Sequence, residues 1–300
     1  PMFLRPPNCA TPHILVLGSA MSCLYLIKGR DYALLGGGVS WEIAQLEAQL
    51  NFFGIDRHRI RYLVISHVHH DHCGAAAYLL RRYPHLQTVA SPYGAHLLQH
   101  AKPLGVINEL NRAALERLNL PPHHNGIALD LEPIAVTHQV NDNDVLDLGC
   151  NLSLLFFSTP GHSRCSLTTY IPEQMALFPA DAVPIPHDRG QKLIVTANHD
   201  FDDYLNSLAK LHPLAIKWVG YEHNGILTET GAESIIQRSL DATRRQRQRI
   251  VARYQTLQDL NKVVAEVAAK YQALAIFRAV PKATMHAIIQ RMVRSALGQV

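Results

Sequence analysis

The sequence contains no uninterrupted apolar run that approaches the roughly 20 residues needed to cross a bilayer. Residues 1–7 also lack the long apolar core of a secretory signal. Apolar residues nevertheless make up 48% of the 300 residues, which is enough for one large domain, or for a domain with an appendage. We therefore expect a cytoplasmic protein that does not associate with membranes.

Cysteine is scarce, and its distribution argues against a disulfide framework. The five cysteines are odd in number, scattered and without a Cys-x-x-Cys pair: Cys9, Cys23, Cys73, Cys150 and Cys165. Free thiols of this kind are typical of a reducing compartment.

Charge gives no indication of a nucleic-acid partner, because 28 basic and 24 acidic residues leave a formal net charge of only +4. Histidine, by contrast, is unusually frequent and occurs 18 times. Histidine is a frequent metal ligand, so its local spacing matters more than its total.

The six residues from His67 to His72, His-Val-His-His-Asp-His, contain four potential metal ligands besides His70, which we expect to point away from the site. Residues 60–66 before them are apolar and β-branched and predict a buried strand, whereas residues 75–82 after Gly74 predict a helix. A loop between two such elements holds ligands rigidly and leaves one side open. Imidazole and carboxylate together favour zinc, iron or manganese over calcium or magnesium.

Two ions would need more ligands than this cluster contains, and three further donors occur downstream. They are His162, Asp181 and His223, and each follows an apolar run that predicts a strand and then a Gly or Pro turn. The recurrence of strand, turn and donor at four places predicts that these side chains belong to one metal centre.

This ordered pattern resembles the metallo-β-lactamase superfamily, whose dinuclear members carry a His-x-His-x-Asp-His signature, a later His, a bridging Asp and a last His. The resemblance covers residues 13–225 and implies an α/β fold, the αββα sandwich of that family. It also implies two divalent transition-metal ions, zinc or iron, with manganese as a further option. Carried over position by position, it implies seven ligands: His67, His69 and His162 for the first ion, Asp71, His72 and His223 for the second, and Asp181 for both.

Within the superfamily the general hydrolase branch, with its glyoxalase II-like thioesterases, fits best. β-Lactamases usually have another residue at the place of His72, and flavo-diiron oxygen reductases have a Glu at the place of His69. Residues 63–67 and 72–74 and a helical C-terminus are also similar to the quinolone-signal response proteins. Those are aminobenzoylacetyl-coenzyme A thioesterases of this fold with added C-terminal helices.

One departure from the family pattern concerns an early turn. Many members have an Asp-Thr-Gly turn there, whose Asp braces the metal loop, but this chain has Leu34-Leu35-Gly36-Gly37-Gly38 without a carboxylate. Outer partners of metal ligands fix the orientation of the imidazoles, so this difference affects the choice or the occupancy of the metal.

The composition changes after Gly231, and we predict two domains. Residues 1–230 would form the metallo-β-lactamase-like αββα domain, and residues 231–300 a C-terminal helical extension with helices over 232–257, 260–271 and 281–297. The last helix carries an apolar stripe that is typical of a core or of a homodimer interface: Met285, Ile288, Ile289, Met292 and Val293. Further expected elements are strands at 13–17, 23–27 and 32–35, a helix capped by Ser40, and a helix over 201–211 capped by Asp200.

These observations predict a metal-dependent hydrolase that uses a hydroxide held between two ions to attack a thioester or a related activated ester. The substrate would be a small-molecule ester or thioester, and Asp71 would be the catalytic residue, since it would orient the hydroxide and carry a proton to the leaving group. Two alternatives stay open: a phosphodiesterase or lactonase of the same superfamily, and a regulatory or interaction protein that keeps the metal site.

The run of basic residues over 244–249 admits three interpretations. It would bind an anionic substrate such as a coenzyme A phosphate, face a protein partner, or simply form a solvated helix face.

Overall fold

The computed structural model describes residues 3–187, 192–277 and 280–299. The chain divides into two compact units. Unit 1 comprises residues 1–158, 165–180 and 215–233, and unit 2 comprises residues 159–164, 181–214 and 234–300. The predicted domain boundary after residue 230 stays a prediction. In the described part of the chain, no helix combines the length and the apolarity that crossing a membrane requires.

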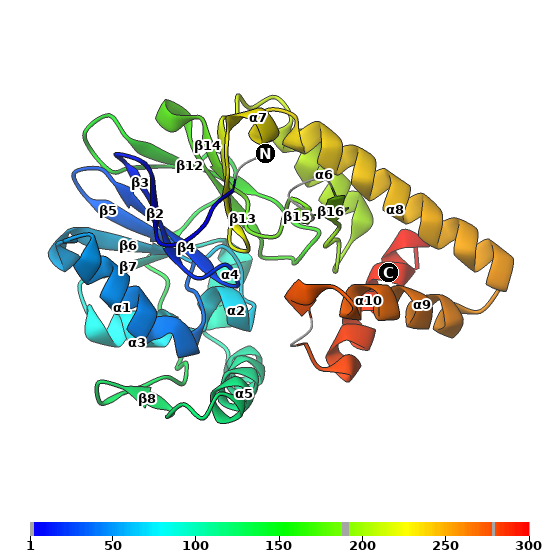
Figure 1. Cartoon of the computed structure of the whole chain (residues 1–300), viewed down its shortest axis with the longest axis horizontal. Helices are drawn as coiled ribbons and strands as arrows, with labels where there is room; N and C mark the ends of the chain where they lie inside the picture. The colour runs from blue at the N-terminus through cyan, green and yellow to red at the C-terminus, as the bar shows by residue number, and fades with distance from the viewer. Residues whose placement is uncertain (1–2, 188–191, 278–279, 300) are drawn as a thin grey trace. The chain divides into compact units, whose positions relative to one another are not determined.

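Two seven-stranded sheets form the body of unit 1 (Figure 1). In spatial order, the first contains β10 (His138–Gln139), β7 (Gln87–Ala90), β6 (Ile60–Val64), β5 (Tyr32–Leu35), β4 (Cys23–Lys28), β3 (Ile14–Gly18) and β2 (Asn8–Thr11). The second contains β1 (Phe3–Leu4), β18 (Gly225–Leu227), β17 (Trp218–Tyr221), β14 (Ala176–Phe178), β13 (Leu167–Ile171), β12 (Ser153–Ser158) and β11 (Val145–Asp147). Because β5, β6 and β7 run parallel, their carboxyl ends meet at one edge of the first sheet, and the His67–His72 loop starts there.

Side-chain alternation along the strands explains how the sheets pack. Ile14 and Val16 of β3 belong to the core between the sheets, together with Phe156 of β12. The intervening Leu15 and Leu17 belong to a second core, with residues of α1 (Ile43–Phe52) and α3 (Ala76–Arg82). Strand β3 is therefore buried on both faces, which explains its continuous apolar sequence.

The remaining elements of unit 1 are short or peripheral. They are α2 (His70–Cys73), α4 (Pro92–Leu98), α5 (Ala101–Arg117), β8 (His123–His124), β9 (Ile127–Ala128) and α7 (Glu229–Ala232). The prediction that Ser40 caps a helix is wrong. Ser40 opens a single 3₁₀ turn, Ser40–Glu42, so α1 begins three residues later with Glu42 at its N-cap position. The Ser40 hydroxyl consequently has no helix N–H group within reach.

Unit 2 is largely helical. It contains the paired strands β15 (Ile185–His187) and β16 (Lys192–Ile194) and the helices α6 (Phe201–Leu211), α8 (Ile235–Leu257), α9 (Leu260–Gln272) and α10 (Lys282–Ala296). Helix α8 packs on α6, and α10 packs on α9. The Asp200 carboxylate accepts a hydrogen bond from the Asp203 N–H at 2.9 Å, which confirms the predicted cap of α6.

The apolar stripe of α10 lies in the core of unit 2. Met285, Ile289, Met292 and Val293 are buried, and Ile288 is half-buried. The predicted mixed α/β fold, with two sheets, flanking helices and a helical C-terminal region, is thus confirmed.

Phe156 provides a test of the core between the sheets. Its side chain is fully buried there, so we expect Phe156→Ala to lower the free energy of unfolding by about 3–5 kcal/mol. Urea titration followed by circular dichroism measures this loss. Val145 in the same sheet is 62% exposed, and Val145→Ala should change stability by no more than about 0.5 kcal/mol. Equal losses in the two variants would contradict this description of the core.

Candidate metal centre

Backbone contacts with a glycine turn fix the loop that follows β6. The Gly37 N–H donates to the His72 carbonyl at 2.7 Å, and the Ala75 N–H donates to the Gly37 carbonyl at 2.9 Å. A Cβ atom on Gly37 would lie 2.8 Å from both the Cys73 Cα and the His72 carbonyl oxygen. Only glycine fits at this position, and the turn without a carboxylate therefore holds the loop by close approach.

Four of the predicted imidazole ligands form a chain of contacts in unit 1. The His67 Nε2 and His69 Nδ1 atoms lie 3.0 Å apart. The ring centroids of His67 and His72 are separated by 4.1 Å, and those of His72 and His223 by 5.0 Å. Nitrogens that bind one tetrahedral ion at ~2.1 Å lie roughly 3.4 Å from each other, so the spacing of His67 and His69 fits a common ion.

Asp71 lies beside two of these imidazoles. Its Oδ2 atom is 3.5 Å from the His72 Nε2 and 3.8 Å from the His223 Nε2, and the three donors lie within 4.8 Å of one another. Burial favours the neutral carboxyl, but the adjacent His72, His70 and His223 outweigh it and hold the pKa of Asp71 well below its usual range. The carboxylate is therefore ionised at neutral pH, as cation binding requires.

Hydrogen bonds at the opposite ring nitrogens orient two of these ligands. The His223 Nδ1–H donates to the Met21 carbonyl at 2.6 Å, and the His72 Nδ1–H donates to the Glu222 carboxylate. A neutral imidazole that donates from Nδ1 presents its lone pair at Nε2. In both residues that Nε2 atom is the one near Asp71, which suits metal binding.

Glu222 is the functional residue that the sequence analysis missed. It follows β17 and is only 7% exposed, yet its carboxylate contacts His72, which lies 150 positions earlier in the chain. A Cβ on Gly36 would lie 3.3 Å from the Glu222 Cδ, so the glycine turn leaves the space that this side chain fills. The carboxylate that contacts the His67–His72 loop thus comes from a segment distant in the sequence. The only signal in the sequence was its position directly before His223.

The two other predicted ligands, His162 and Asp181, lie together in unit 2. Both are buried, and the His162 Nε2 lies 3.3 Å from the Asp181 Oδ2. The His162 Nδ1–H donates to the Thr196 carbonyl at 2.9 Å, so the lone pair at Nε2 faces the carboxylate. The Asp181 carbonyl in turn accepts hydrogen bonds from the hydroxyls of Thr196 and Tyr204, at 3.0 Å and 3.1 Å.

A glycine also determines the turn before His162. Gly161 has a φ of +124°, and a Cβ there would lie 2.4 Å from the backbone of Tyr204 in α6. The Gly161 carbonyl accepts hydrogen bonds from the N–H groups of His199 and Asp200, both at 2.9 Å. The start of α6 and the His162 turn are therefore packed backbone to backbone.

The seven predicted ligands thus fall into two groups, one in each unit. Unit 1 contains His67, His69, Asp71, His72 and His223, and unit 2 contains His162 and Asp181. Buried or half-buried imidazoles with oriented lone pairs, together with an ionised carboxylate, suit a divalent transition metal. Calcium and magnesium, which prefer oxygen ligands, suit this set poorly.

The thiol next to the cluster is a packing residue. Cys73 is fully buried, and its Sγ donates to the His69 carbonyl at 3.1 Å. Burial raises the pKa of Cys73 well above that of a free thiol, so it stays protonated and unreactive.

Comparisons with known proteins point to one family. The family model of the Metallo-beta-lactamase superfamily matches residues 21–223. The chain is 27% identical over 223 residues to the metallo-beta-lactamase fold-containing protein ST1585 of Sulfurisphaera tokodaii, covering 73% of this chain and 79% of that protein. It is 23% identical over 254 residues to the atrochrysone carboxyl ACP thioesterase of Aspergillus fumigatus. That match covers 84% of this chain but only 62% of the thioesterase.

Among solved structures, the metallo-beta-lactamase family protein TTHA1429 from Thermus thermophilus superposes with a TM-score of 0.65. The superposition covers 96% of this chain and 94% of that protein, at 16% sequence identity. At this level of identity the likeness concerns the fold alone, and it confirms the expected αββα class.

The Glu222 contact predicts a specific change in metal binding. In Glu222→Gln the amide still accepts from His72 but carries no charge, so we expect zinc affinity to fall by about 10- to 100-fold. Competition with a chromophoric chelator measures the affinity. Glu116→Gln makes the same chemical change on the exposed surface of α5 and should bind zinc as the unaltered protein does. Equal affinities in both variants would exclude a supporting role for Glu222.

Proposed function

The chain belongs to the metallo-β-lactamase superfamily, and on that premise we propose that it is a metal-dependent hydrolase of a thioester or a related activated ester. One observation carries the proposal, namely that the Asp71 carboxylate lies 3.5 Å from the Nε2 atom of His72 and 3.8 Å from that of His223. One ligand atom from each of these three residues lies within 4.8 Å of the others, which is close enough for all three to bind one ion.

We assign the ligands as the family pattern does. His67, His69 and His162 would bind one divalent ion, Asp71, His72 and His223 the other, and Asp181 both. Zinc, iron and manganese all suit these donors. When bound, two such ions lower the pKa of a water molecule toward neutrality and polarise the carbonyl group of an ester.

The chain's own residues supply orientation and proton transfer. The Asp71 side chain is 32% exposed, so water and substrate reach it, and its Oδ1 atom lies 3.6 Å from the His70 Nδ1. It is therefore suited to accept a hydrogen bond from water and to carry a proton to the leaving group. Glu222 and the Met21 carbonyl keep His72 and His223 in position during that transfer.

Two observations favour a thioester among the possible substrates. The relative from Aspergillus fumigatus is a thioesterase by name, and its match spans 84% of this chain. The His-x-His-x-Asp-His signature and the helical C-terminus also resemble the glyoxalase II-like branch and the quinolone-signal response proteins, and we propose that the chain belongs near them. Lactones and phosphodiesters are the competing substrate classes.

Metal content tests the ligand assignment. We expect two transition-metal ions per chain by mass spectrometry of the metal-loaded protein and about one in His223→Ala, because the second ion loses one of its terminal ligands. His123, an exposed residue of β8, serves as the control, and His123→Ala should keep both ions. A single ion in the unaltered protein would rule out the dinuclear assignment.

Activity tests the reaction. The metal-loaded protein is assayed with an acyl-coenzyme A, S-lactoylglutathione, an acyl-homoserine lactone and bis(p-nitrophenyl) phosphate. We expect a thioester to be the best substrate, and Asp71→Asn to lower kcat/KM by at least about 100-fold because the amide cannot take up a proton.

Asp130→Asn, which alters an exposed carboxylate paired with Arg112, should leave the activity unchanged. Preferred hydrolysis of the phosphodiester would reassign the reaction. The absence of turnover with all four substrates would rule out the hydrolase.

A further inference from the structure

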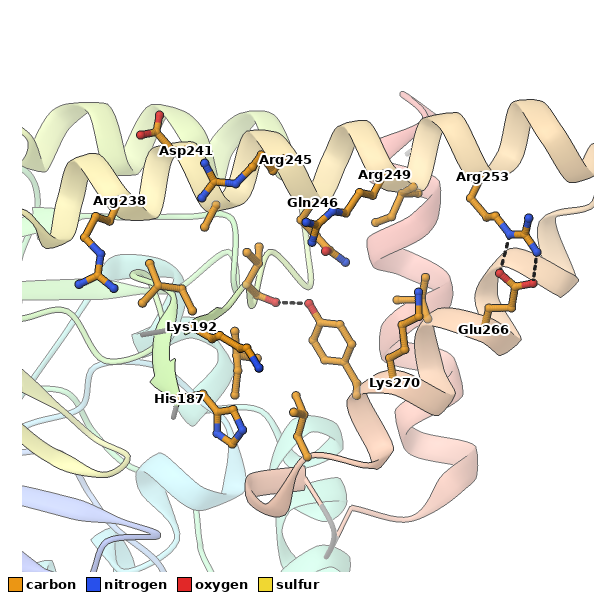
Figure 2. Close-up of a pocket in the computed structure, with 18 residues that line it drawn as sticks. His187, Lys192, Arg238, Asp241, Arg245, Gln246, Arg249, Arg253, Glu266 and Lys270 are labelled. Carbon is orange, nitrogen blue, oxygen red and sulfur yellow. Dashed lines mark hydrogen bonds and ion pairs between the residues drawn. The ribbon is translucent and has the colours of Figure 1, made fainter. Parts of the chain in front are cut away.

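Unit 2 contains a cavity of about 860 Å³ that the proposed chemistry does not use (Figure 2). It lies between α8, α9 and β16, and its volume is in the range typical of small-molecule sites. All of its lining residues belong to unit 2. The cavity is therefore defined within that unit.

The lining is strongly basic. Six cations line it: Lys192, Arg238, Arg245, Arg249, Arg253 and Lys270. Among the described residues, only two carboxylates do so, Asp241 and Glu266. The resulting excess of four positive charges equals the formal net charge of the whole chain, so the charge imbalance of this protein is concentrated in one cavity.

The cations come from three separate elements. The four arginines follow one another at intervals of seven, four and four residues along α8, which places them on one side of that helix. Figure 2 shows Lys270 extending from α9 toward α8, with Lys192 contributed by β16. If the arginines of α8 served only solubility, there would be no reason for lysines on β16 and α9 to line the same cavity.

Both carboxylates are already engaged. Glu266 accepts two hydrogen bonds from Arg253, at 2.6 Å and 2.7 Å. Asp241 accepts from the Gln237 amide at 3.1 Å and lies 3.9 Å from the Arg244 guanidinium, and neither of those partners lines the cavity. Among the described residues, by contrast, Arg245 and Arg249 form no ion pair, so their charge remains available to a ligand, whereas Lys270 also acts on the Glu266 carboxylate.

One part of the lining is apolar and buried. Ile194, Ile250 and Val267 form it and are each less than a tenth exposed. The Tyr271 ring lies beside them, held by a hydrogen bond from its hydroxyl to the Val195 carbonyl at 2.6 Å. The cavity thus combines an apolar patch with a cationic wall.

We infer that this cavity binds a small organic ligand that carries two or more phosphate groups. Guanidinium groups match phosphate oxygens in pairs, and several of them around one concave space favour a compact polyanion over a single phosphate. The apolar patch provides a surface for the organic part of the same ligand. This inference goes beyond the proposed hydrolysis and does not depend on it.

Isothermal titration calorimetry of the full chain tests the inference, with ADP, inorganic diphosphate and a hexaglutamate peptide as probes. We expect ADP to bind with one-to-one stoichiometry. Binding should weaken at least about tenfold in the Arg245→Gln/Arg249→Gln variant, since two charge-assisted hydrogen-bonding groups are lost. Inorganic diphosphate should bind more weakly than ADP, because it does not reach the apolar patch.

Arg294→Gln is the matched control, because Arg294 is an exposed residue of α10 outside the lining, and its loss should leave ADP binding unchanged. Thermal denaturation checks that the variants fold. If the double variant does not fold, Lys270→Gln, which removes a cation on α9, serves in its place. No saturable binding of ADP or diphosphate would overturn the inference, as would equal ADP affinity in all variants. Tighter binding of hexaglutamate than of ADP would also overturn it and would assign the surface to an acidic protein segment.

Discussion

The hydrogen bond between Glu222 and His72 is the contact on which the donor group of unit 1 depends. It fixes the ring of the most buried ligand in that group and leaves its Nε2 atom toward Asp71. A buried carboxylate is costly unless it is paired, and His72 supplies that pairing. The same contact ties the end of β17 to the loop after β6, so one interaction orients a ligand and joins the two sheets.

The close approach of backbone around that contact explains why glycine dominates the turn after β5. Gly36 leaves space for the Glu222 carboxylate, and Gly37 allows the chain to touch the carbonyl of His72. A turn residue with its own carboxylate would compete with Glu222 for the same volume. In this chain the carboxylate that contacts the metal loop therefore comes from the end of β17, and the turn after β5 leaves room for it.

The sequence predicted the parts of this protein that depend on local pattern. The strands β3 to β6, the α6 helix with its Asp200 cap, and the helices α8 to α10 follow from apolar periodicity and end signals, and all lie within a few residues of expectation. The predicted helix cap at Ser40 was wrong, because a serine that opens a 3₁₀ turn has the same sequence pattern as a serine that caps an α-helix. Glu222 and the basic cavity were out of reach, since both depend on residues that are distant in the chain and meet only after folding. The basic run over 244–249 predicted an anionic ligand, a protein partner or a solvated face, because periodicity does not distinguish the wall of a cavity from an outer helix surface.

Concentration of the excess charge in one cavity has a consequence for the behaviour of the whole molecule. The chain has an isoelectric point near 8.8, and its remaining residues carry basic and acidic groups in equal number. A polyanion seated on α8 would bring the complex close to electrical neutrality at physiological pH. Electrostatic repulsion between molecules would then weaken, so the protein would be less soluble with the cavity filled than with it empty.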